Sequence, residues 1–216
     1  MSGRAQRGPP TRPSRRRTAT RGDDMAEVVL FHHAQGLTTG ITDFAEALRD
    51  AGHTVHTPDL YEGQTFETLD DGLAYMKQVG FDTILERGKT AGEALPAEVV
   101  WAGFSLGVMP AQLLAQTRPG ARGALLMESC VPPSEFGDGW PDEVPVQVHG
   151  MADDPIFAGE GDLEAGRALV EEAADGELFT YPGAVHLFAD NSISTYDAEQ
   201  AAVLTDRVLE FLDRVS

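Results

Sequence analysis

Residues 99–107 of the chain read Val99-Val100-Trp101-Ala102-Gly103-Phe104-Ser105-Leu106-Gly107. The first half is an apolar run with β-branched residues, which is typical of a buried strand. The second half has the form Gly-x-Ser-x-Gly, and residues 106–116 have the composition of a helix. This order predicts a sharp strand-to-helix turn that lifts the hydroxyl of Ser105 clear of the sheet. The glycines have a steric reason, because side chains two residues on either side of the serine would collide across such a turn.

The same alternation of apolar runs and helical segments continues in both directions from this turn. Strands are predicted at residues 28–31, 54–57, 99–102, 124–127, 144–148 and 178–181. Helices are predicted at residues 41–51, 66–94 with a break near Gly80, 106–116, 163–173 and 197–215. Apolar strands separated by helices favour a mostly parallel sheet with helices on both faces, an α/β fold in a single domain without a lid. The functional groups of such a sheet lie beyond the carboxyl ends of its strands.

The composition limits the size, location and partners of the protein. A length of 216 residues, 42% of them apolar, suits one domain with a substantial core. The single cysteine, Cys130, excludes an internal disulfide, and no apolar run approaches the roughly 20 residues of a membrane-spanning helix. The net charge of -19 repels nucleic acid and anionic membranes. We therefore expect a cytoplasmic protein without nucleic-acid or membrane partners, and both a monomer and a homodimer are compatible with the sequence.

The first 24 residues differ from the rest of the chain. They are rich in arginine, proline, glycine and threonine and have no apolar periodicity, so they cannot bury enough surface to fold. Residues 14–17 resemble a twin-arginine export signal, but no hydrophobic stretch follows them. We predict that residues 1–24 are a disordered basic tail or an upstream extension, and that the domain comprises residues 25–216.

A serine nucleophile needs a base, and two histidines follow Ser105 in the chain. His149 lies within a predicted strand. His186 lies in a loop after the last predicted strand, from which it can reach across the top of the sheet. Where a serine occupies such a turn, the chain order is serine, acid, histidine. We therefore predict that His186 is the base.

The carboxylate that orients the base is expected shortly after the predicted strand at residues 144–148. Asp153 and Asp154 are both candidates. Counting three residues from Gly150 favours Asp153, whereas the proline that follows Asp154 fixes the chain directly after that carboxylate. We prefer Asp154, and Asp153 then serves as a turn residue.

Three motifs together resemble the dienelactone hydrolase family over about residues 26–215. They are Pro58-Asp59-Leu60-Tyr61, Gly103-Phe104-Ser105-Leu106-Gly107 and Tyr181-Pro182-Gly183-Ala184-Val185-His186-Leu187-Phe188-Ala189. The resemblance implies a lidless α/β-hydrolase fold with a Ser/Cys–Asp–His triad, here Ser105, Asp154 and His186. It also implies an oxyanion hole made by two backbone N–H groups. One is that of Leu106, and the other falls in residues 33–37, where we expect Ala34.

Three departures from the family pattern bear on the substrate. Characterised members have a cysteine where this chain has Ser105, and a glutamate at the position that aligns with His33. They also bind the substrate carboxylate through arginines, one of which falls where this chain has Asp190. Because an aspartate there would repel an anionic lactone, we expect the substrate to be a neutral ester or lactone.

Several weaker signals are assigned to structure rather than to chemistry. Residues 88–90 resemble the end of a phosphate loop but lack its preceding glycine, and neither His32-His33 nor His53-x-x-His56 forms a three-ligand metal pattern. We expect no cofactor and no metal. Cys130 has no elbow around it and is interpreted as a packing residue. Four aromatic residues are candidates for an apolar substrate pocket: Phe104, Trp140, Phe157 and Phe188.

Three classes of function remain in view. The first is a serine hydrolase that cleaves a small ester or lactone through an acyl-enzyme. The second is a thioesterase or peptidase with the same triad. The third is a non-catalytic α/β-hydrolase-like protein that binds a ligand or partner, against which the intact order of Ser105, Asp154 and His186 argues.

Overall fold

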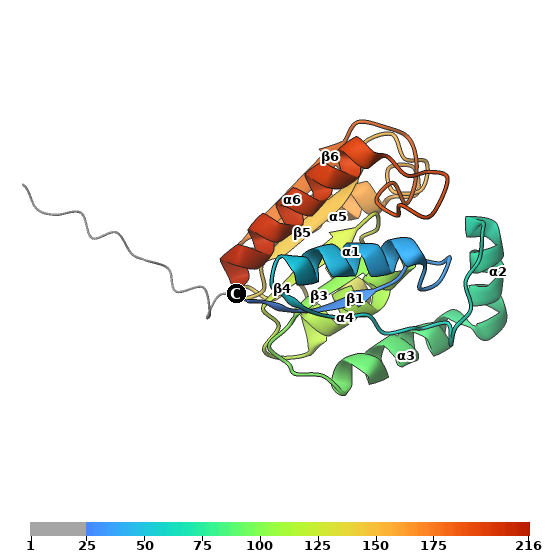
Figure 1. The fold of residues 1–216 in the computed structure, drawn as a ribbon. Helices are drawn as coiled ribbons and strands as arrows, with labels where there is room; N and C mark the ends of the chain where they lie inside the picture. The colour runs from blue at the N-terminus through green and yellow to red at the C-terminus, as the bar shows by residue number, and fades with distance from the viewer. Residues whose placement is uncertain (1–24) are drawn as a thin grey trace, which may run out of the picture.

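The computed structural model describes residues 25–216, so the predicted tail at residues 1–24 lies outside the described part of the chain. Its centre is a sheet of six strands in the order β2-β1-β3-β4-β5-β6, and every neighbouring pair is parallel (Figure 1). The strands are β1 (Glu27–Phe31), β2 (Thr54–His56), β3 (Val100–Phe104), β4 (Gly123–Met127), β5 (Val146–Met151) and β6 (Gly176–Tyr181). The parallel sheet agrees with the predicted α/β class.

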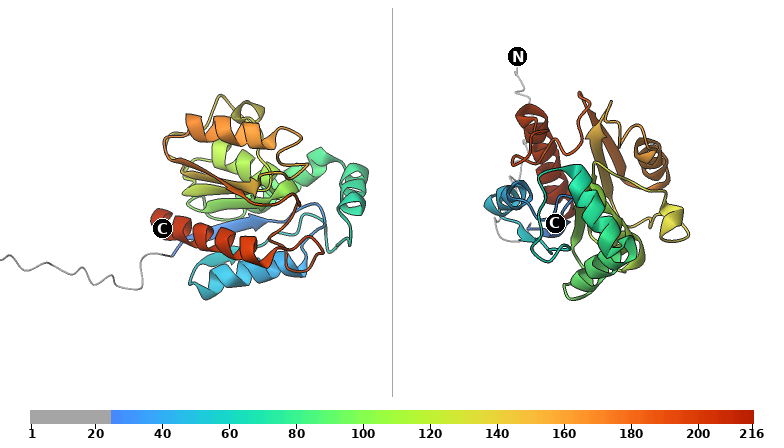
Figure 2. Two further views of the ribbon diagram at one scale, coloured as in Figure 1. Left: turned by 90° about the horizontal axis from the view of Figure 1, so that it is seen from above. Right: turned by 90° about the vertical axis from the view of Figure 1, so that its right-hand side faces the viewer.

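Residues 25–216 also contain six α-helices and two short 3-10 helices, of which α6 follows the last strand and the others lie between strands. They are α1 (Thr39–Asp50), α2 (Leu69–Val79), α3 (Phe81–Glu93), η1 (Ser105–Gly107), α4 (Val108–Thr117), η2 (Pro133–Glu135), α5 (Asp162–Glu172) and α6 (Ala198–Val215). The left view of Figure 2 shows α1 and α6 on one side of the sheet and α4 and α5 on the other. None of the helices in residues 25–216 combines the length and apolar character needed to cross a membrane.

The core has two layers because strand side chains alternate between the faces. In β1, Val29 and Phe31 pack toward α3, α4 and α5, whereas Val28 and Leu30 pack toward α1 and α6. Both layers consist mainly of fully buried aliphatic and aromatic side chains. The sheet is therefore covered on both faces, and its central strands read as continuous apolar runs for this reason.

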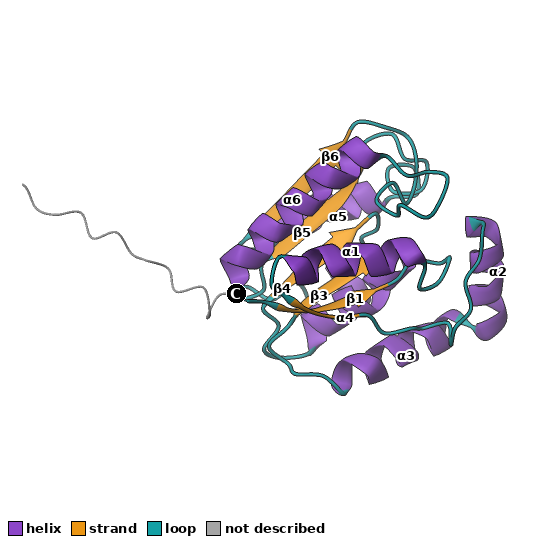
Figure 3. Cartoon of the chain, viewed as in Figure 1, coloured by secondary structure: helices purple, strands orange, loops and turns teal. Residues whose placement is uncertain are grey.

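The strand order places a topological switch beside β1. The chain runs from β1 outward to β2 and then crosses back to β3 on the other side of β1. The loops after β1 and β3 therefore leave the sheet as neighbours, and a crevice at such a point is the usual ligand site of an open α/β sheet. Figure 3 shows the loops in teal gathered on the side of the molecule where α2 lies.

The observed boundaries differ from the predicted ones mainly at β5 and β6. β5 begins two residues later than predicted and runs to Met151. Pro145, which has no N–H to donate, precedes the first paired residue. β6 begins earlier, at Gly176, because it is an edge strand that is only half-buried and so carries polar residues. The predicted break near Gly80 is confirmed, since Gly80 has φ +96° and separates α2 from α3.

Candidate active site

Ser105 stands on a strained turn between β3 and the 3-10 helix that leads into α4. Its φ of +48° lies in the left-handed region, which is rare for a residue with a side chain. A Cβ on Gly103 would lie 2.1 Å from the carbonyl oxygen of Gly107, and one on Gly107 would lie 2.4 Å from that of Phe31. Both glycines are therefore required by backbone contacts, as the steric argument predicts.

His186 bridges Ser105 and Asp154 by two hydrogen bonds. Its Nε2 lies 2.8 Å from Ser105 Oγ, and its Nδ1 lies 2.6 Å from Asp154 Oδ2. The second oxygen of Asp154 accepts the N–H of Ile156 at 2.8 Å, which fixes the carboxylate. Asp154 is fully buried, whereas Asp153 is exposed, and the hydrogen bond of His186 Nδ1 is to Asp154. Of the two aspartates left open by the sequence, the structure brings Asp154 to the histidine.

The electrostatic surroundings favour a basic imidazole beside an ionised carboxylate. Burial alone lowers the pKa of His186, but the hydrogen bond that its ring donates to Asp154 and the charges of Glu128, Asp154 and Asp162 outweigh burial, so the net pKa is raised. Burial raises the pKa of Asp154, but the hydrogen bond and charge of His186 outweigh that effect and the net pKa is lowered. When His186 takes up a proton, the positive imidazolium therefore lies beside the negative carboxylate of Asp154, which stabilises it.

The two backbone N–H groups expected to form an oxyanion hole lie on adjacent connections of the sheet. Leu106 follows Ser105 at the start of the 3-10 helix, and Ala34 lies in the loop after β1. A Cβ on Gly72 would lie 2.0 Å from the carbonyl oxygen of Ala34, so α2 packs closely against this loop. Within residues 25–216, no hydrogen bond of the Ala34 N–H is found.

Asp190 does not face the substrate side, contrary to the sequence-based expectation. It is 3% exposed, and its Oδ2 accepts the Nε2–H of His33 at 2.7 Å and the hydroxyl of Thr38. Its Oδ1 accepts the N–H of Ser192 at 2.8 Å. Two of the three positions that depart from the family pattern, 33 and 190, therefore contact each other. This buried pair joins the loop that carries Ala34 to the loop that follows His186.

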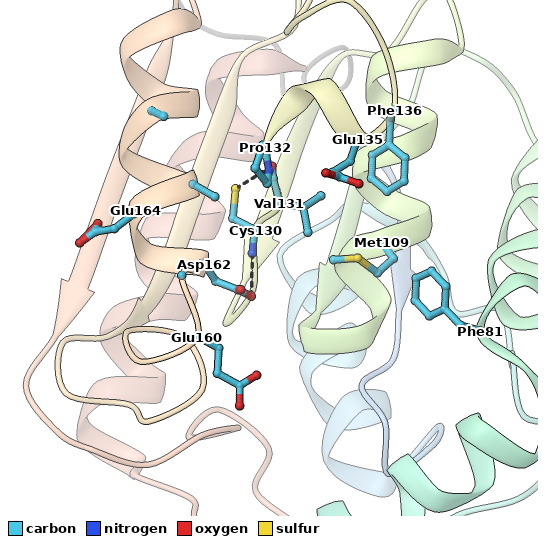
Figure 4. A pocket seen from close by; sticks show the side chains of 13 residues that line it. Phe81, Met109, Cys130, Val131, Pro132, Glu135, Phe136, Glu160, Asp162 and Glu164 are labelled. Atoms are coloured by element: carbon cyan, nitrogen blue, oxygen red, sulfur yellow. Dashed lines mark hydrogen bonds between the residues drawn. The ribbon is translucent and has the colours of Figure 1, made fainter.

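The four aromatic residues proposed to line a substrate pocket are all buried in the core: Phe104, Trp140, Phe157 and Phe188. None of them lines the pocket of about 720 Å³ that Figure 4 shows. Its apolar members include Phe81, Met109, Val131, Pro132 and Phe136. Its carboxylates are Glu135, Glu160, Asp162 and Glu164, and the lining contains no lysine or arginine.

None of Ser105, Asp154 and His186 lines this pocket, which is related to them through Met109 and Asp162. Met109 is four residues after Ser105, at the start of α4. Asp162 begins α5 and lies close enough to His186 for its charge to raise the pKa of the imidazole. Asp162 is itself held by the hydroxyl of Ser129 at 2.6 Å and by the N–H of Cys130.

Glu128 is a residue near His186 that the sequence reasoning missed. It follows β4 directly and is fully buried, and its Oε1 accepts the N–H of Phe188 at 2.8 Å. A signal was present, because an acidic residue at the end of an apolar strand lies where functional groups of parallel sheets gather.

The weaker signals are accounted for within the fold. His32 Nε2 accepts the N–H of Leu60 at 2.9 Å, and His53 Nδ1 accepts that of Ala26 at 3.2 Å. No group of three or more His, Cys, Asp or Glu side chains suited to a metal ion occurs in residues 25–216. Cys130 is buried in the core, and burial raises the pKa of its thiol.

The parallel six-stranded sheet, the strained serine turn and the histidine beyond β6 define an α/β-hydrolase fold. The model of the dienelactone hydrolase family matches residues 17–216, so the chain belongs to this family and is a carboxylic ester hydrolase by class. No curated protein sequence matched the chain.

Solved structures of other enzymes have the same fold. One is a dienelactone hydrolase-like promiscuous phosphotriesterase from metagenomic libraries, with a TM-score of 0.67 and 21% identity over 88% of this chain and 86% of that one. Another is esterase 2 of Thermogutta terrifontis phosphonylated by cyclosarin, with a TM-score of 0.65 and 15% identity over 90% and 84%. At these identities the likeness shows a shared fold.

Proposed function

We propose that the protein is a serine hydrolase that cleaves a small neutral ester or lactone through an acyl-enzyme. Ser105 is the nucleophile, His186 the general base and Asp154 the carboxylate that orients it. The observation that carries this proposal is the continuous hydrogen-bonded chain from Ser105 Oγ through His186 to Asp154, with distances of 2.8 and 2.6 Å.

The proposed reaction begins with attack of Ser105 Oγ on the carbonyl carbon of the ester. His186 Nε2 takes the hydroxyl proton as the new C–O bond forms, and Asp154 stabilises the resulting imidazolium. When the tetrahedral intermediate collapses, the bond to the leaving alcohol breaks and His186 returns its proton to the alcohol oxygen. A water molecule then attacks the acyl-enzyme by the same route, which releases the acid and restores the hydroxyl of Ser105.

We assign the developing oxyanion to the backbone N–H groups of Leu106 and Ala34. The N–H groups at the start of a helix have no partner within the helix, and a negative charge is favoured there. One such donor typically contributes about 3 kcal/mol to the transition state. The close contact of Gly72 with the carbonyl of Ala34 supports a rigid loop at this position.

We infer that the pocket beside Met109 receives the apolar part of the substrate. Its volume of about 720 Å³ and its apolar lining suit a small acyl or alcohol group. Its carboxylates repel a negative charge on the substrate. A neutral ester therefore remains the proposed substrate class, on this charge distribution rather than on Asp190.

A fluorophosphonate probe tests the proposed nucleophile. Mass spectrometry is expected to show one adduct, on the peptide that contains Ser105. Ser105→Ala is expected to fold normally and to lose at least about a thousandfold in turnover, because no other group replaces the nucleophile. An adduct on Cys130, or unchanged esterase activity in Ser105→Ala, contradicts the mechanism.

A panel of p-nitrophenyl esters, thioesters and lactones separates an esterase from a thioesterase with the same triad. The chain offers two matched controls for this panel, Ser105→Ala and Cys130→Ala. Activity on the esters or lactones that depends on Ser105 and not on Cys130 supports the proposal. Turnover of the thioesters alone favours the alternative, and no labelling or turnover at all favours a binding protein.

A further inference from the structure

Glu128 occupies an unusual position for a carboxylate. It follows β4, the strand between β3, which leads to Ser105, and β5, which leads to Asp154. Its side chain is fully buried, and its backbone φ of +63° lies in the left-handed region. A buried carboxylate and a strained backbone are both unfavourable for stability, and such features cluster at functional sites.

One oxygen of Glu128 holds the segment that carries His186. Its Oε1 accepts the N–H of Phe188, two residues after the histidine, at 2.8 Å. Leu187, between the two, has a φ of +62°, so the segment adopts a specific left-handed bend at this point. The backbone N–H of Glu128 donates to the carbonyl of His149 on β5 at 2.6 Å, which fixes Glu128 against the sheet.

The other oxygen has no hydrogen-bond partner among the described residues. Glu128 Oε2 is buried and unpaired within residues 25–216. A side chain that only accepts one N–H does not need to be ionisable, because any neutral oxygen can accept that hydrogen bond. The presence of a carboxyl group at this buried position therefore requires a separate explanation.

The charged groups around Glu128 identify what that charge acts on. Its surroundings include His186, Asp154 and Asp190, and burial together with the two aspartates raises its pKa to about 7, against the effects of His186 and the Phe188 N–H. In turn, the charges of Glu128, Asp154 and Asp162 raise the pKa of His186. Among these groups the histidine is the one that can become positive.

We propose that Glu128 is a positioning residue of the catalytic machinery, which fixes the segment bearing His186 through the Phe188 N–H and stabilises the imidazolium form of His186 with its charge. This inference rests on the proposed function. Protonation of His186 in the reaction favours ionisation of Glu128, because opposite charges at close range in a poorly solvated site attract strongly. Asp154 and Glu128 thus act on the imidazole from neighbouring strands.

Glu128→Gln separates the two parts of this role. The amide oxygen of glutamine still accepts the Phe188 N–H, but the charge is lost. We expect kcat to fall about three- to tenfold and the acidic limb of the pH profile of kcat/KM to move down by about 0.5 to 1 pH unit, since a less basic imidazole remains. Glu171→Gln removes an exposed carboxylate on α5 and is the matched control, with both quantities expected to stay at wild-type values.

A histidine titration by NMR measures the same coupling without turnover. In wild-type protein labelled with 15N-histidine, His186 is expected to titrate in two steps because it is coupled to a second group. In Glu128→Gln a single step at lower pH is expected. A single step in the wild type, or an unchanged pH profile in a folded Glu128→Gln, overturns the proposal. Failure of Ser105 labelling overturns the proposed function instead, and the wild-type titration still tests Glu128.

Discussion

Replacement of Asp190 by asparagine tests whether the buried pair holds the active-site loops together. The ring of His33 is oriented by its neighbours, because its Nδ1 accepts the N–H of Gln35 at 3.1 Å. Its proton is therefore on Nε2 and is donated to Asp190. Thr38 and Ser192 also donate to this carboxylate, so all of its neighbours are donors. An asparagine must turn an NH2 group toward one side, where it meets a donor.

The structure allows the magnitude of this change to be worked out. Burial raises the pKa of Asp190, but hydrogen bonds from His33, Ser192 and Thr38 outweigh it and lower the pKa from an ordinary 3.8 to about 2. At about 1.4 kcal/mol per pKa unit, this corresponds to about 2.5 kcal/mol of stability. A buried donor left without its acceptor costs about 1 to 3 kcal/mol, which agrees in size. We expect Asp190→Asn to lose about 2 to 4 kcal/mol in the free energy of unfolding.

Urea unfolding at several pH values measures this loss. Because the folded pKa lies below the unfolded one, the contribution of Asp190 is fully present above about pH 4 and disappears as the pH falls through 2. The difference in the free energy of unfolding between wild type and Asp190→Asn should therefore become smaller as the pH falls from about 4 to 2. Asp43→Asn is the control. Asp43 is exposed, and within residues 25–216 its carboxylate accepts one side-chain hydrogen bond, from Asn191. Equal free energies of unfolding for wild type and Asp190→Asn at pH 7 refute the reasoning.

Four further outcomes are expected. Asp154→Asn should lower kcat by about four orders of magnitude, because the imidazole loses its preferred tautomer, while Asp153→Asn stays near the wild type; the opposite order contradicts the assignment. The kcat/KM of a neutral ester should exceed that of its carboxylate analogue, and equal values contradict the proposal that the pocket carboxylates repel an anionic substrate. Glu128→Gln should gain stability over wild type as the pH rises from 4.5 to about 7, by about 3 kcal/mol, because over this range the carboxyl group ionises in the unfolded protein while it stays protonated in the folded one; a pH-independent difference in Tm contradicts this. A chain that begins at Met25 should keep its Tm and activity, and a loss of several degrees counts against a dispensable tail.

Local sequence patterns predicted the fold because they reflect local physics. Apolar runs marked the central strands, which are buried on both faces, and the glycine at position 80 marked the break between two helices. The predicted beginnings of β6 and β5 were wrong, because β6 is only partly buried and a proline precedes the first residue of β5. Those positions lack the continuous apolar signal on which the prediction depends.

Chain order and turn chemistry predicted which three residues the structure joins by hydrogen bonds. Ser105, His186 and Asp154 could be named from the elbow and from the loops after two strands. The pair of His33 and Asp190 could not, because its members are 157 residues apart and each was interpreted alone. The aromatic residues were misplaced for a related reason, since composition does not distinguish a core side chain from a pocket side chain.

The acidic surroundings of His186 and the choice of serine are consistent with one requirement. A serine hydroxyl is much less acidic than a cysteine thiol, so in the proposed mechanism Ser105 depends on a stronger base than a cysteine would. Three carboxylates, Asp154, Glu128 and Asp162, raise the pKa of the imidazole against the effect of burial. They come from the ends of two neighbouring strands and the first residue of α5, so the sheet itself delivers them to one point. Asp162 belongs both to this group and to the four carboxylates of the pocket, so under the proposed function one residue contributes to a basic imidazole and to a preference for a neutral ester.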